Sequence, residues 1–149
     1  MGYGGSSKAV KHEWLAQPHT HPDNKLCAFY ALHHFTDGKV TKNAFIDKAT
    51  SVYTDIGLPK EDALAMVLDG NDPATLGQFG LKEGNDAALQ QKGVGIVANT
   101  DKGHFFTVRQ ENGKWYSYDS YNHKAPKEYA TFADLKKAEI GNSGVWVGT

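Results

Sequence analysis

A single cysteine, Cys27, stands at the start of the stretch DNKLCAFYALHHF, whose apolar spacing predicts a helix. The thiolate is the reactive form of cysteine. A helix N-terminus lowers the pKa of a thiol through its unpaired N–H groups and the positive end of its dipole. Asp23 or Asn24 would supply the N-cap, which leaves Cys27 in the first turn. This position predicts a reactive thiol, and a buried structural cysteine is the alternative.

A cysteine nucleophile needs a base, and the base needs a group that orients it. Among the seven histidines, His104 begins the predicted strand HFFTVRQ, and Asp119 ends the next one, across the hairpin signal Asn112-Gly113. We expect position 104 to lie nearly opposite 119 or 120, with Cβ atoms about 5 Å apart, within reach of a hydrogen bond. An ordinary loop histidine and a turn-capping aspartate are the alternative reading.

The surrounding pattern predicts an α+β fold, because helices come first and an antiparallel sheet follows. The first half should contain helices, with shorter helical pieces after Asp72-Pro73. The second half should contain strands and one more helix, capped by Thr131. The predicted helices are 27–35, 42–55, 60–68, 85–93 and 132–140, and the predicted strands are 94–100, 104–110, 114–121 and 144–149.

Two blocks of the chain, LCAFYALHHF and HFFTVRQENGKWYSYDS, resemble the Josephin family of papain-like cysteine proteases. The resemblance covers less than a quarter of the chain. It implies a papain-like fold in which the catalytic helix packs on the antiparallel sheet. It also implies that Cys27 is the nucleophile, His104 the base and Asp119 the orienting residue.

The chain departs from that family in two places. The family's oxyanion glutamine lies a few residues before the nucleophile, and no glutamine occupies that offset here. The candidates for the missing hydrogen-bond donor, in order of preference, are Gln17, His21 and Asn24, each acting beside the Cys27 N–H. The interval between the two blocks is also short, with little room for the long helical hairpin that grips ubiquitin in Josephin domains.

The predicted chemistry fits several functions. The first is a cysteine hydrolase that attacks an amide or isopeptide carbonyl of a protein substrate, as a protease or deubiquitinase. Small papain-like effector and toxin domains of bacteria are similar too, so a protein glutamine deamidase is the alternative; an inactive binding module is a further one. The expected partner is a ubiquitin-like or glutamine-bearing protein, and an inhibitor or immunity protein could cover the cleft. We expect a monomer.

Composition makes other classes of function less favourable. The net charge is −1 and the 16 Lys and Arg are scattered, so we expect no nucleic-acid partner. No apolar run approaches a membrane span, and one cysteine forms no internal disulfide. We therefore expect a cytoplasmic protein, or one that is secreted or delivered into a target cell as an effector or toxin domain.

We expect neither a cofactor nor a metal ion. Five side chains near the start of the chain are types that bind zinc, but no spacing among them completes a tetrahedral set. We therefore expect solvated loop histidines. The five residues are His19, His21, Cys27, His33 and His34.

The organisation of the chain is simple. Residues 1–12 begin with a glycine- and serine-rich stretch that indicates a flexible leader or a cloning remnant, and this stretch also fits the myristoylation pattern at Gly2. Residues 13–149 are long enough for one catalytic domain with its own core, and the hydrophobic content of the whole chain, 40%, is that of a globular protein.

Overall fold

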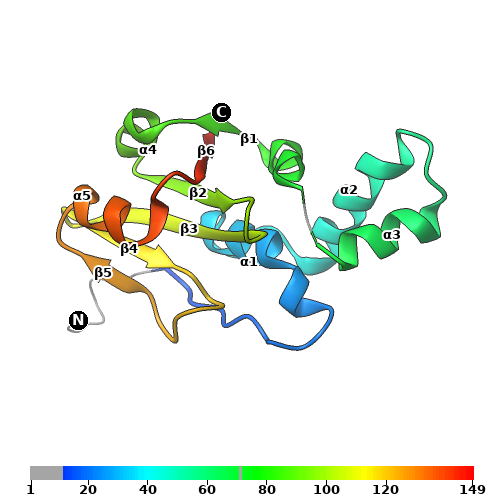
Figure 1. The fold of residues 1–149 in the computed structure, drawn as a ribbon, viewed down its shortest axis with the longest axis horizontal. Coiled ribbons are helices and arrows are strands. Elements are labelled where there is room, and N and C mark those ends of the chain that lie inside the picture. The colour runs from blue at the N-terminus through cyan, green and yellow to red at the C-terminus, as the bar shows by residue number, and fades with distance from the viewer. Residues whose placement is uncertain (1–11, 71) are drawn as a thin grey trace.

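The computed structural model describes residues 12–70 and 72–149. Helices dominate its first half and strands its second (Figure 1). The leader predicted over 1–12 lies outside the described residues except for His12, whose ring contacts Asp37 and Glu111. In chain order the elements are η2 (Asp23–Lys25), α1 (Cys27–Phe35), α2 (Lys42–Thr54), α3 (Lys60–Leu68), η3 (Pro73–Phe79), β1 (Leu81–Gly84), α4 (Asp86–Lys92), β2 (Val94–Asn99), β3 (His104–Glu111), β4 (Lys114–Tyr118), β5 (Lys127–Tyr129), α5 (Phe132–Leu135), η4 (Lys136–Ile140) and β6 (Gly144–Gly148).

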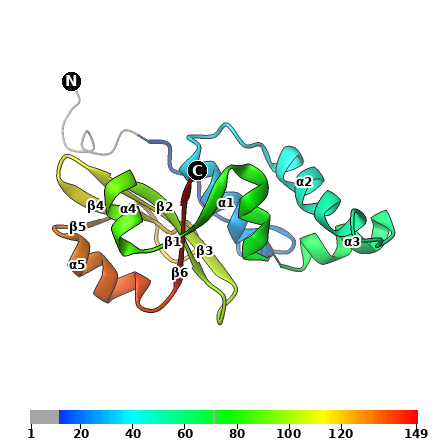
Figure 2. The same ribbon diagram turned by 90° about the horizontal axis from the view of Figure 1, so that it is seen from above.

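The α+β prediction is confirmed: helices pack on a six-stranded antiparallel sheet of order β1-β6-β2-β3-β4-β5 (Figure 2). Successive side chains of a strand point to opposite faces, so the sheet separates two cores. One core lies against α1 and the other against α4 and α5. Ile96, Ala98 and Phe105 belong to the first core, and Val97, Phe106 and Val108 to the second.

Two strands escaped the sequence-based prediction. Both β1 and β5 are short, mostly exposed edge strands, made from the polar sequences LKEG and KEY. Neither sequence carries a period-2 apolar pattern. The two segments are strands because their backbones pair with β6 and β4. The helix predicted over 132–140 is α-helical only to Leu135 and continues as the π-helical η4.

Helix α1 occupies the centre of the first core. Seven of its nine residues are buried, so nearly its whole circumference is covered by protein. Two side chains of β3 attach to its backbone: Thr107 Oγ1 donates to the Ala31 carbonyl at 2.5 Å, and Arg109 Nη2 donates to the His34 carbonyl at 2.8 Å. These bonds hold α1 in a defined position along β3.

The N-terminus of α1 is not capped in the predicted way. Asp23 lies in η2, where its Oδ2 accepts hydrogen bonds from Tyr30 Oη and Lys42 Nζ, each at 2.7 Å. Leu26 takes the N-cap position and makes no side-chain cap. The first backbone N–H groups of a helix have no intrahelical acceptor. In the part of the chain that the structure describes, no N-cap side chain accepts from those of α1, the helix that begins at Cys27.

Helices α2 and α3 pack against each other at the end of the molecule away from α5, in both views (Figures 1 and 2). This helical pair fills the interval that the sequence indicated was too short for a long hairpin. Exposed apolar side chains here include Ile56, in the connection between the two helices, and Met66 in α3. Within residues 12–70 and 72–149, no helix combines the length and apolar character needed to cross a membrane.

His34 predicts a pH dependence of stability. Burial, together with the charges of His33 and Arg109, lowers its pKa to about 4, and its Nε2 accepts the Leu15 N–H at 3.0 Å. An unfolded histidine titrates near 6.5, so the unfolded chain binds the extra proton first as pH falls below that value. Stability should therefore be lost between about pH 6.5 and 4, amounting to about 2 kcal/mol at pH 5.

Urea unfolding of the wild type and of His34→Gln at pH 7 and pH 5 measures this effect. Glutamine keeps an acceptor for Leu15 but does not titrate. The wild type should lose about 2 kcal/mol more than the variant on acidification. Equal losses in the two proteins would show that His34 is not the titrating group.

Candidate active site

The Cys27 thiol lies at the first residue of α1, with 7% of its surface exposed. Three groups bond to it from two parts of the chain: the Gln17 side chain, and the ring of His104 with the backbone of the next residue, Phe105. Gln17 Nε2 donates to Sγ at 3.3 Å. The sulfur is thus surrounded by hydrogen-bond donors, an arrangement that stabilises a thiolate.

His104 connects this thiol to Asp119. Its Nε2 lies 2.9 Å from Asp119 Oδ1, which leaves Nδ1 as the ring nitrogen for Cys27. The ring also stacks on Phe106, with centroids 5.6 Å apart, and this contact limits its rotation. The structure therefore brings together the three side chains that the sequence analysis selected for catalysis.

The strand register that brings His104 to Asp119 differs from the predicted one. Asn112 and Gly113 both have positive φ and form a two-residue turn, so Glu111 pairs with Lys114 and Thr107 with Tyr118. Continued to position 104, this register would place residue 121 opposite it. Strand β4 instead ends at Tyr118, and Asp119 meets His104 because the chain turns there.

Asp119 is held firmly by that turn. Its Oδ1 accepts the backbone N–H groups of Tyr121 at 3.3 Å and Asn122 at 3.1 Å, and its Oδ2 accepts Asn122 Nδ2 at 2.9 Å. Only 3% of Asp119 is exposed. Asn122, through its backbone N–H and its side chain, thus fixes the carboxylate that faces His104.

The electrostatics of the three groups agree with one another. Burial raises the pKa of Cys27, but hydrogen bonds from His104 and Gln17 and the charge of His104 outweigh it, so the thiol pKa lies below its usual value. Burial lowers the pKa of His104, but the hydrogen bonds to Asp119 and Cys27 outweigh burial and raise this pKa to about 9. Burial raises the pKa of Asp119, and the His104 bond brings it below its usual value. These directions favour a thiolate–imidazolium pair beside an ionised carboxylate.

Of the three oxyanion candidates, Gln17 is the one whose side chain contacts Cys27. It is 4% exposed, its Nε2 also donates to the Asp23 carbonyl at 2.8 Å, and its backbone N–H donates to the Ser120 carbonyl at 3.2 Å. His21 is exposed, and Asn24 lies in η2 with a buried Oδ1 that has no hydrogen-bond partner among the described residues. The loop before α1 bends enough to bring Gln17 back to the sulfur.

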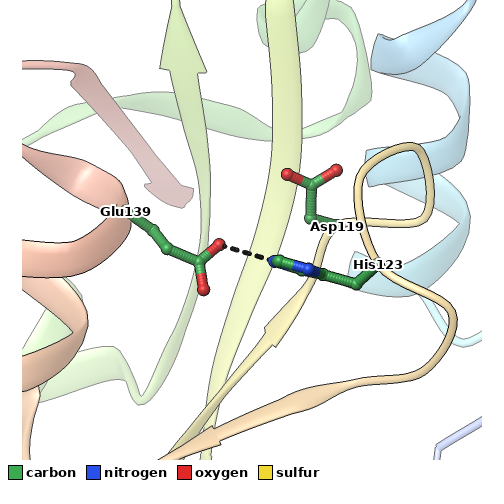
Figure 3. A group of neighbouring side chains, drawn as sticks. All are labelled: Asp119, His123 and Glu139. Atoms are coloured by element: carbon green, nitrogen blue, oxygen red, sulfur yellow. Dashed lines mark hydrogen bonds and ion pairs between the residues drawn. The ribbon is translucent and has the colours of Figure 1, made fainter.

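The histidines considered for a metal make separate contacts. His19 bonds to the Tyr121 carbonyl, His33 to Glu13 and His34 to the Leu15 N–H. A different trio of possible ligands, Asp119, His123 and Glu139, gathers its ligand atoms within 4.8 Å of one another. Figure 3 shows His123 directed at Glu139, with Asp119 beside the ring.

The oxygens of that trio already have partners. Glu139 accepts Ser117 Oγ at 2.8 Å, the Tyr129 hydroxyl and His123 Nε2 at 3.3 Å. Asp119 is held by His104 and its own turn. The sequence analysis did not select Glu139 as a site residue. It lies four residues after Leu135, on the face of the predicted helix that packs on the sheet.

A cavity of about 490 Å³ adjoins His104 and Asp119. Its lining includes Phe106, Tyr121, Tyr129 and Glu139, from β3, the turn after β4, β5 and η4. The chain matches no profile of a known protein family and no curated protein. The geometry of Cys27, His104 and Asp119 is therefore the basis for interpreting this site.

Proposed function

We propose that the protein is a papain-like cysteine hydrolase acting on an amide or isopeptide carbonyl of a protein substrate. Cys27 is the nucleophile, His104 the general base and acid, and Asp119 the residue that orients the imidazole. The observation that carries the proposal is the buried Cys27 at a helix start, hydrogen-bonded to His104, whose other nitrogen lies 2.9 Å from Asp119. A buried structural cysteine does not require either partner.

The contacts support the following sequence of steps. The Cys27 thiolate attacks the carbonyl carbon, and its proton resides on His104. The Cys27 backbone N–H and Gln17 Nε2 donate to the oxygen that becomes negative. The C–N bond then breaks, and His104 gives its proton to the departing nitrogen. Water, deprotonated by His104, attacks the thioester and releases the acid and the Cys27 thiolate.

Two kinds of leaving nitrogen are compatible with this machinery. A peptide or isopeptide nitrogen makes the enzyme a protease or deubiquitinase, and ammonia from a glutamine makes it a deamidase. A ubiquitin probe with a C-terminal electrophile separates them. A covalent adduct with the wild type and none with Cys27→Ala supports a deubiquitinase. Ammonia release with a one-dalton mass gain on a target protein supports a deamidase.

The ion pair itself predicts how Cys27 reacts with iodoacetamide. The midpoint of its pH–rate profile should lie below the value of about 8.5 for a free thiol, because His104 and Gln17 stabilise the thiolate. The same chain unfolded in urea is the matched control and should titrate as a free thiol. A midpoint that does not change between the folded and the unfolded chain would falsify the proposal of an activated nucleophile.

A further inference from the structure

Gln17 reaches Cys27 from a short segment that runs along α1. This segment, residues 14–17, has the sequence WLAQ and precedes the helix in the chain. Its Leu15 N–H donates to His34 Nε2 in the last turn of α1, and its Gln17 side chain donates to the sulfur at the first residue of α1. The 14–17 segment therefore runs antiparallel to the helix, from its C-terminal turn to its first residue.

The two ends of this path lie on the same face of α1. Positions 27 and 34 are almost two helical turns apart, which is about 10 Å along the axis at a rise of about 1.5 Å per residue. The chain from Leu15 to Gln17 covers at most about 7 Å when extended, and the glutamine side chain covers the rest. A segment that starts at His34 thus has little slack when it brings Gln17 Nε2 to the sulfur.

The contacts at His34 are buried. This residue is 2% exposed, and its Nε2 accepts the Leu15 N–H at 3.0 Å. The ring of Trp14 stacks on the His34 ring, with centroids 5.4 Å apart and an angle of 23° between the planes. At the other end of the segment, the Gln17 N–H donates to the Ser120 carbonyl at 3.2 Å. The backbone that carries the Gln17 side chain is therefore fixed on both sides.

The neighbouring histidine does not hold the segment in this way. His33 Nε2 lies 2.9 Å from Glu13 Oε1, just before the segment, but the Glu13 side chain is 65% exposed. An exposed ion pair of this kind adds little to stability because solvent screens it. Of the two adjacent histidines, His34 is thus the one whose loss should displace the 14–17 segment.

We propose that His34 is a positioning residue: by accepting the Leu15 N–H and stacking on Trp14, it fixes where the 14–17 segment places Gln17 Nε2. The effect of an oxyanion donor depends on its being in place before the reaction, and a shift of about 1 Å can cost about a hundredfold in rate. This inference rests on the proposed hydrolase function, because His34 acts only through the oxyanion that Gln17 stabilises.

Two reagents separate the oxyanion donor from the rest of the site. With 4-nitrophenyl acetate, the Cys27 sulfur bonds to the acetyl carbon through a tetrahedral oxyanion, and 4-nitrophenolate leaves. With iodoacetamide, the sulfur displaces iodide directly, and no oxyanion forms. Both reagents react with the thiolate, so the ratio of acylation to alkylation rates at one pH cancels the ionised fraction of Cys27. The ratio therefore reports the oxyanion donor.

The test compares two substitutions of His34 in the full-length protein. His34→Leu removes the acceptor for Leu15, and His34→Gln keeps one. His34→Leu should lower the acylation-to-alkylation ratio about ten- to a hundredfold, and His34→Gln should keep most of the wild-type ratio. In a Gln17→Ala background, His34→Leu should lower the ratio by less than about twofold, because no donor is left to position.

Three results would overturn the positioning role. They are an unchanged ratio in His34→Leu, equal losses in the leucine and glutamine variants, and a His34→Leu loss that is the same with and without Gln17. Trp14→Ala covers the case in which leucine at position 34 prevents folding. The Trp14 ring is only half-buried, and its loss should lower the ratio about three- to tenfold, again only where Gln17 is present. An unchanged ratio in Trp14→Ala would also contradict the proposal.

The same measurements test the hydrolase separately. If Gln17→Ala lowers the ratio while His34→Leu and Trp14→Ala do not, the role of His34 alone is lost. If 4-nitrophenyl acetate releases 4-nitrophenolate equally with the wild type and with Cys27→Ala, the hydrolase is lost, and the role of His34 with it.

Discussion

Replacing His104 by alanine should reduce substrate turnover about 10²- to 10⁴-fold, the range typical of losing a general acid–base group. The imidazole holds the proton that the thiol loses and gives it to the departing nitrogen. Its loss should also move the midpoint of Cys27 alkylation upward. The reason is that burial alone raises the pKa of this thiol, and the bond and charge of His104 are the main contributions that oppose it.

His33→Gln is a suitable control for the histidine substitution. His33 lies on the same helix as Cys27, but its ring bonds to Glu13 on the surface. This variant should keep both turnover and the alkylation midpoint. If His104→Ala kept the low midpoint as well, the helix terminus and the bond from Gln17 would account for the acidity of Cys27, and His104 would lose its assigned role.

The second large effect is expected at Gln17. Removing one donor of an oxyanion hole typically lowers kcat about 10²- to 10³-fold, and Gln17→Ala should do the same. Its Nε2 has two hydrogens; one is used by the Asp23 carbonyl, and the other points to the sulfur. Because the charge on the carbonyl oxygen develops only in the transition state, kcat should fall while KM stays nearly constant.

The measurement is steady-state kinetics of Gln17→Ala beside His21→Ala and Asn24→Ala, which remove the other two candidates. Far-UV circular dichroism and thermal unfolding establish that each variant is folded. A loss of kcat confined to His21→Ala or Asn24→Ala would show that the replaced residue, and not Gln17, is the side-chain donor of the oxyanion hole. A rise in KM with unchanged kcat for Gln17→Ala would make it a binding residue instead.

Local signals in the sequence were sufficient for most of the elements. The helix that the apolar spacing of 27–35 predicts is α1, and the turn that Asn112-Gly113 predicts joins β3 and β4. Thr131 caps α5 as expected, since its Oγ1 accepts the Asp134 N–H at 3.1 Å. Each of these features depends on residues within a few positions of one another, so a short window contains the information.

Other features depend on residues far apart in the chain. Strands β1 and β5 exist because β6 and β4 offer backbone groups to pair with, and their own sequences carry no strand pattern. Asp23 does not cap α1 as expected, because its carboxylate accepts hydrogen bonds from Tyr30 and Lys42 instead. The bond from Lys42 requires α2 to lie close by. Glu139 lines the cavity beside His104 only because η4 packs over the sheet.

The sequence by itself determined the chemical types and the order of the elements: a cysteine that opens a helix, a histidine that opens a strand and an aspartate beyond a tight turn. The tertiary structure alone decided that these side chains meet. Packing α1 against β3, with Thr107 and Arg109 bonded to its backbone, places the sulfur beside the imidazole. The physical reason is range, since helix and turn formation follow neighbouring residues, whereas burial and long-range hydrogen bonding choose which elements touch.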